Sequence, residues 1–158
     1  MNLQDRLSTL HQLAAHLTGP EDEFLTALQK RTEFNNAWFT LENQQVSIKA
    51  IAGAFLTEEK LAAWLNGYKI TPVAGEGFVP QPGSGCEGQK TVGLVLAGNI
   101  PLVGFHDILC VYVAGHKAQI KQSSKDEYVL PYLLKLLAKF DERAAAYFEL
   151  VDTMADYD

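Results

Sequence analysis

The sequence has few cysteines and a deficit of positive charge, and each shortage excludes a class of protein. Its only two cysteines, Cys86 and Cys110, lie in unlike settings and do not form a disulfide framework. The 13 Lys and Arg residues are outnumbered by 19 Asp and Glu residues, which gives a formal net charge of -6. This balance argues against nonspecific binding to nucleic acid or anionic membranes, although a local lysine can still bind an anionic ligand.

Long apolar runs are also absent. No run approaches the roughly 18 apolar residues that a membrane-spanning helix needs. Near the N-terminus, Asp5 and His11 interrupt the apolar stretch that a signal peptide requires. We therefore expect a cytoplasmic protein without a membrane span. A metal site is not expected, because His11 and His16 have no carboxylate or cysteine at zinc-site spacing.

Residues 1–71 have the apolar spacing of amphipathic helices, and we assign them no chemistry. Helix starts are predicted at residues 21–23, which are acidic, and at Thr40 and Thr57, which can cap a helix. Residues 72–90 hold three prolines and five glycines without periodicity, which is typical of a connecting segment on the surface.

From residue 91 the pattern predicts alternating strands and helices. Residues 91–98 form an apolar, β-branched run that indicates a strand buried on both faces. A helix over 101–115, a strand over 118–121 and a helix opening at Ser123 then follow. Such an order is typical of a right-handed parallel crossover unit. The chain is therefore predicted to be an α/β protein, with a helical N-terminal region followed by a partial nucleotide-binding domain over residues 91–158.

Ligands of open parallel sheets bind beyond the carboxyl ends of the strands. Two segments fall there: residues 98–101, with the sequence Gly-Asn-Ile-Pro, and residues 121–124, with the sequence Lys-Gln-Ser-Ser. Neither strand is followed by G-x-G-x-x-G, so the usual dinucleotide fingerprint is absent. If a pyrophosphate is bound, another part of the protein must hold it.

Residues 91–135 resemble the segment that opens the cofactor domain of aldehyde dehydrogenases. The segment GLVLAGNIPLVGFHDILCVYVAGHKAQIKQSSKDEYVLPYL has that superfamily's order of strand, N-x-P, helix, glycine, strand and lysine. The wording GNIPLVGFHD and KQSSKD is more similar to the LuxC-type fatty acyl-CoA reductases. The resemblance implies a Rossmann-like parallel cofactor domain, of which this chain would carry the first part.

The resemblance also implies roles for four residues. Asn99 would be the amide that stabilises the oxyanion of the thioester. Lys121 would reach the adenosine ribose. Ser124 stands where members that prefer NAD often carry a glutamate, and a neutral serine there favours NADPH, with Ser123 able to share the role. Gln122 departs from the proline that is common in aldehyde dehydrogenases. From the residues alone, Asn99 could simply cap a helix and Lys121 could be a solvated strand end.

The nucleophile that the resemblance implies is not expected in this chain. Cys110 lies in an apolar helix, where a thiolate would be destabilised, and Cys86 has a glutamate beside it and no histidine partner. The reaction would be reduction of a fatty acyl-CoA to the aldehyde, with the cysteine supplied by a later domain. Because only two strands are predicted, we expect a homo-oligomer or a missing C-terminal half to complete the sheet.

Two rival interpretations stay open. The chain could be a non-catalytic interaction or scaffold module that binds no nucleotide. It could also belong to another reductase of the aldehyde dehydrogenase superfamily, acting on an acyl phosphate or a short aldehyde. Nucleotide binding separates the first rival, and the acyl donor that the complete enzyme turns over separates the second.

Overall fold

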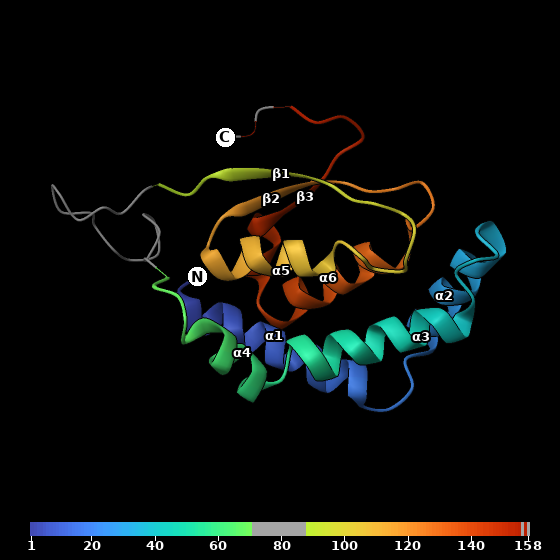
Figure 1. Ribbon diagram of the computed structural model, residues 1–158, viewed down its shortest axis with the longest axis horizontal. Helices are drawn as coiled ribbons and strands as arrows, with labels where there is room; N and C mark the ends of the chain where they lie inside the picture. Colours follow the sequence, from blue (N-terminus) through green and yellow to red (C-terminus); the bar gives the residue numbers. More distant parts are fainter. Residues whose placement is uncertain (71–87, 156, 158) are drawn as a thin grey trace, which may run out of the picture.

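The computed structural model describes residues 1–70, 88–155 and 157, so most of the predicted connecting segment, with Cys86, lies outside the described residues. The protein has a helical N-terminal region and a small parallel sheet with its own helices (Figure 1). The first region comprises α1 (Leu3–Thr18), α2 (Glu23–Asn35), α3 (Leu41–Ala50), the π-helical turn η1 (Ile51–Phe55) and α4 (Glu58–Leu65). The second comprises β1 (Thr91–Val95), α5 (Phe105–Ala114), β2 (Lys117–Lys121), α6 (Val129–Phe140), the 3-10 helix η2 (Glu142–Tyr147) and β3 (Phe148–Leu150).

The N-terminal helices begin where their capping residues predict. Asp22 accepts the backbone N–H groups of Phe24 and Leu25 at the start of α2. Thr40 and Thr57 cap α3 and α4 in the same way. These bonds satisfy N–H groups that have no partner inside the helix. The three helix starts predicted from the sequence are therefore confirmed.

The sheet has the strand order β1-β2-β3, and both strand pairs are parallel. Val95 is in register with Lys121, and Ile120 with Leu150, so all three strands end at one edge. Helices α5 and α6 cover one face of the sheet, and the N-terminal helices pack beneath them (Figure 1). The parallel strand–helix–strand–helix unit predicted over residues 91–140 is thus confirmed.

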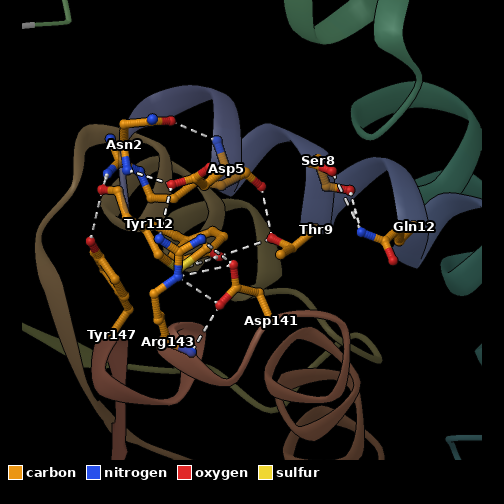
Figure 2. Close-up of polar contacts among 11 residues, drawn as sticks. Asn2, Asp5, Ser8, Thr9, Gln12, Tyr112, Asp141, Arg143 and Tyr147 are labelled. Carbon is orange, nitrogen blue, oxygen red and sulfur yellow. Dashed lines mark hydrogen bonds and ion pairs between the residues drawn. The ribbon is translucent and has the colours of Figure 1, made fainter. Parts of the chain in front are cut away.

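Polar contacts join the two regions. The hydroxyl groups of Thr9 in α1 and Tyr112 in α5 lie 2.9 Å apart, both in buried residues (Figure 2). The guanidinium of Arg143 donates hydrogen bonds from Nε and Nη2 to the Asp141 carboxylate. It also forms an ion pair with Asp5 of α1 at 3.3 Å (Figure 2). Since α1 packs on α5 and α6 as well, the N-terminal helices are anchored to the layer that covers the sheet. The boundaries at 71 and 91 stay a prediction.

Several details of the sequence prediction were wrong. β1 is an edge strand of the described sheet and not buried on both faces: Val95 is 71% exposed. The third strand, β3, was not predicted, because three residues carry no readable periodicity. The expectation that a partner completes the sheet rested on only two predicted strands. Three strands covered by helices remove that reason.

Both sheet-region helices begin later than predicted. Helix α5 starts at Phe105, four residues after Pro101, and α6 starts at Val129 and not at Ser123. The residues in between form turns at the carboxyl edge of the sheet. Gly115 ends α5 in the left-handed conformation (φ 87°), as expected of a C-terminal glycine. Across the described ranges, no helix combines the length and apolar character that crossing a membrane requires.

Candidate functional site

The predicted site residues lie at the end of β2 and in the two loops at the carboxyl edge, and these two loops touch each other. The N–H of Leu96, just after β1, donates to the carbonyl of Lys121 at 3.0 Å. Beyond this bond, Gly98 lies directly against Ser123, because a Cβ atom built on Gly98 would collide with the Ser123 side chain. The segments predicted to carry chemistry therefore form one continuous surface.

A buried carboxylate joins the same two loops. Asp126 accepts the N–H of Leu102 at 2.7 Å, and only 8% of the Asp126 residue is exposed. Leu102 has φ 58°, and no other non-glycine residue in the described ranges has a positive φ. Burial raises the pKa of Asp126, and the N–H of Leu102 partly offsets that rise. Asp126 thus holds the loop that carries Asn99 in a conformation that leucine rarely adopts.

The connection between α2 and α3 forms a wall beside these loops. The Asn35 amide donates to the Tyr128 hydroxyl at 2.7 Å, and the Asn36 amide donates to the carbonyl of Lys125 at 3.3 Å. Arg31 stacks over the Tyr128 ring, with its guanidinium carbon 4.4 Å from the ring centroid. The N-terminal region is therefore docked on the loop that follows β2.

Between this wall and the sheet edge lies a cleft of about 780 Å³, a size typical of small-molecule sites. It brings Asn99 and Ser124, two of the predicted site residues, to the same space. Asn99 is exposed, and its amide has no hydrogen-bond partner in the part of the chain that the structure describes. The cleft is lined by Asn35, Asn36, Trp38, Phe39, Asn43, Val46, Ser47, Gly98, Asn99, Ile100, Pro101, Ser124 and Lys125.

A second cavity, of about 280 Å³, lies at the ends of β2 and β3. It contains Lys121, which is exposed and has no ion-pair partner among the described residues. Ser124 lines both cavities, whereas Ser123 lines neither. The Ser123 hydroxyl accepts the N–H of Lys125 at 3.3 Å. The lining of the second cavity comprises Lys121, Gln122, Ser124, Glu127, Leu150, Val151 and Asp152.

The sequence interpretation missed two groups of residues at these cavities. One is the amide and aromatic wall with Trp38, which is 87% exposed; the polar break NNAW between two helices was its only local signal. The other is the pair of carboxylates, Glu127 and Asp152, beside Lys121. These two charges make the second cavity less favourable to a phosphate than Lys121 and Ser124 alone would suggest.

Cys110 has the surroundings of a packing residue. Burial raises the pKa of its thiol, and the nearby charge of Asp107 raises it further. His106 lies on the same helix, with its Nδ1 3.8 Å from the sulfur, while its ring packs against Phe55. A thiol with a raised pKa is a poor nucleophile at neutral pH.

Comparisons with known proteins do not assign a function to these cavities. No protein-family model matches the sequence, and neither the curated proteins nor the solved structures give a significant match. Among the described residues, no group of three or more His, Cys, Asp or Glu side chains could hold a metal ion. The functional case therefore rests on the two cavities and on the resemblance of residues 91–135.

Proposed function

We propose that this chain is the N-terminal part of a cytoplasmic acyl-CoA reductase of the aldehyde dehydrogenase superfamily. The complete enzyme would convert a fatty acyl-CoA to the aldehyde with NADPH through an acyl-cysteine. The observation that carries the proposal is that Asn99, Lys121 and Ser124 lie at the same edge of the sheet. All three lie at the carboxyl edge of one parallel sheet, and Ser124 lines both the Asn99 cleft and the Lys121 cavity. Ligands of such sheets bind at this edge.

The Lys121 cavity fits the sugar end of the dinucleotide. The free ammonium of Lys121 can donate to the ribose hydroxyls, and the Ser124 hydroxyl can donate to a 2′-phosphate. Glu127 and Asp152 can accept hydrogen bonds from the ribose, but they also repel a phosphate. The preference for NADPH that Ser124 favours is therefore expected to be modest. When bound, the cofactor supplies the hydride that reduces the acyl group.

Asn99 suits the stabilisation of a developing oxyanion. Its amide faces a cleft and is not used by the described fold, so it is available to a thioester oxygen. The Asp126 bond fixes the loop that carries it, so the donor is positioned before the substrate arrives. The raised pKa of Cys110 supports a nucleophile from outside the described residues.

The position of β1 at the edge of the described sheet supports an assembly. In the described sheet β1 pairs with β2 alone, and exposed strand edges favour pairing with another chain. A second copy of the chain or a C-terminal half would cover it. Light scattering on the purified chain tests this part, and a monomer at every concentration would contradict the homo-oligomer.

Calorimetric titration of the chain with NADPH tests the nucleotide site. We expect binding that Lys121→Ala weakens about 10- to 100-fold, the loss of one or two hydrogen bonds from a charged group. Lys60→Ala, at an exposed position on α4, is the matched control. The chain alone should not consume NADPH with a long-chain acyl-CoA. Absence of both NADPH and NADH binding would favour the scaffold interpretation, and turnover by the chain alone would contradict the assigned nucleophile.

A further inference from the structure

The cleft at Asn99 combines carboxamides with exposed apolar side chains. Four asparagines line it: Asn35, Asn36, Asn43 and Asn99. Three of them use their amide N–H groups in bonds to the protein: Asn35 to Tyr128, Asn36 to Lys125 and Asn43 to the carbonyl of Trp38 at 3.3 Å.

The oxygens of these amides accept fewer hydrogen bonds from the described residues than their N–H groups donate. Asn36 accepts the N–H of Trp38 at 3.2 Å. The oxygens of Asn35 and Asn43 accept no hydrogen bond from the described residues, and neither atom of the Asn99 amide has a partner among them. The cleft therefore offers acceptors at Asn35, Asn43 and Asn99 and a donor at Asn99.

Three apolar side chains line the same space and are unusually exposed. Trp38 is 87% exposed, Val46 61% and Ile100 53%. Among the described residues, Lys125 is the only charged one in the lining, and none of the lining residues is a carboxylate. A matching ligand is thus uncharged over most of its length, carries amide groups and also has apolar surface.

We propose that this cleft holds the pantetheine arm of the acyl-CoA thioester, an inference that rests on the proposed function. Pantetheine has two amides, a hydroxyl and a geminal dimethyl group, and its charge is confined to the phosphates at its far end. The two amides can pair with Asn35 and Asn43, while Trp38 and Val46 cover the methyl groups. The thioester end lies at Asn99.

The main rival occupant is the fatty acyl chain, which the same chemistry disfavours. An alkyl chain would remove the asparagine side chains from water without offering them partners. An unpaired buried polar group costs about 1–3 kcal/mol. Four carboxamides around one cleft therefore favour an amide-bearing ligand.

Trp38 provides the readout for a direct test. A Trp64→Phe background leaves Trp38 as the only tryptophan, and its fluorescence is followed during titration with S-acetylpantetheine. We expect a saturable change. Asn43→Ala should weaken binding about five- to tenfold, the loss of one neutral hydrogen bond. Asn66→Ala, at an exposed asparagine outside the cleft, should leave it unchanged.

A second variant shows whether the fluorescence change comes from a ligand in the cleft or from a local rearrangement at Trp38. Val46→Lys places a long side chain across the cleft from an exposed position on α3, so the fold should persist and S-acetylpantetheine binding should be lost. Circular dichroism checks the fold. Failure of S-acetylpantetheine to bind up to about 10 mM overturns the proposal. So does 1-decanol binding that Val46→Lys abolishes while S-acetylpantetheine has no effect.

A parallel NADPH titration separates the two proposals. Binding of NADPH without S-acetylpantetheine contradicts the pantetheine assignment alone. Binding of S-acetylpantetheine without NADPH contradicts the reductase proposal and leaves a pantetheine-binding cleft. Competition between the two ligands would place both in one cavity and would contradict the assignment of separate cavities.

Discussion

Asp126 accepts the backbone N–H of Leu102 at 2.7 Å, across 24 residues of sequence. This bond joins the loop after β1, which carries Asn99, to the loop that follows Lys121 at the end of β2. It also holds Leu102 at φ 58°. The geometry of the candidate site therefore depends on a residue that lines neither cavity.

Removal of this carboxylate should destabilise the protein. Asp126→Ala leaves the buried N–H of Leu102 without an acceptor, and we expect a loss of about 1.5–3 kcal/mol in the free energy of unfolding. Asp126→Asn keeps an acceptor oxygen and should lose less. Urea denaturation measures both, with the exposed Asp152→Asn as control. Equal stability of the alanine variant and the wild type would show that the bond is unimportant.

Asp22 should give the protein an acid-sensitive component of stability. Partial burial raises its pKa, but hydrogen bonds from Tyr132 at 2.6 Å, the N–H of Leu25 and His16 at 2.8 Å outweigh that effect, so the pKa lies at about 2. A carboxyl whose pKa is lowered in the folded state stabilises the protein at pH values above its ordinary pKa, which is 3.8 for Asp22. This stability is lost as the pH falls from 3.8 towards 2.

Thermal unfolding measured from about pH 6 to about pH 2, a range that spans the two pKa values of Asp22, checks this prediction. Asp22→Asn should be less stable than the wild type near neutral pH, and the difference should shrink towards the acidic end. Glu33→Gln, on the same helix and without a hydrogen-bonded partner among the described residues, serves as control. A difference that is independent of pH would contradict the assignment.

The helix starts and the parallel unit could be predicted because their signals are local. A threonine or aspartate before a helix, and two short apolar runs separated by a helix, can be recognised within a few residues. This local pattern also predicted that Asn99 and Lys121 lie at one sheet edge. The parallel register that pairs Val95 with Lys121 confirms this.

The remaining features depend on contacts between distant residues. Ser123 looked like a helix cap, but Asp126 bonds to Leu102 and the helix begins only at Val129. The wall that carries Trp38 reaches the site because Asn35 and Asn36 bond to residues about 90 positions away. No local sequence pattern predicts such contacts.

Cofactor choice should respond to the charge at Ser124. In the complete enzyme, Ser124→Glu should shift the preference from NADPH towards NADH, because a carboxylate in the Lys121 cavity would repel the 2′-phosphate. The ratio of kcat/KM for the two cofactors measures the shift, with Ser8→Glu on α1 as the matched control. An unchanged ratio would remove Ser124 as the discriminating residue.

Removal of the carboxylates beside Lys121 should have the opposite effect. Glu127→Gln and Asp152→Asn each take one negative charge from the cavity, so NADPH affinity should rise a few-fold while NADH affinity changes less. The gain should be largest at low salt, where exposed charges are screened least. Titrations at two salt concentrations test this, and a gain for NADH equal to that for NADPH would mean that the 2′-phosphate lies elsewhere.

The close approach of Gly98 to Ser123 should make the two loops sensitive to a single methyl group. A Cβ on Gly98 would collide with both side-chain heavy atoms of Ser123 and would lie 3.2 Å from the Cβ of Lys125. Gly98→Ala should therefore separate the loops, destabilise the protein by about 1–3 kcal/mol and weaken ligand binding in both cavities. The double variant Gly98→Ala with Ser123→Gly removes the colliding atoms and should recover most of the loss. If the single variant binds and unfolds like the wild type, or if the double variant fails to recover, the loops are not held by this contact, and the shared position of Asn99 and Ser124 would need another explanation.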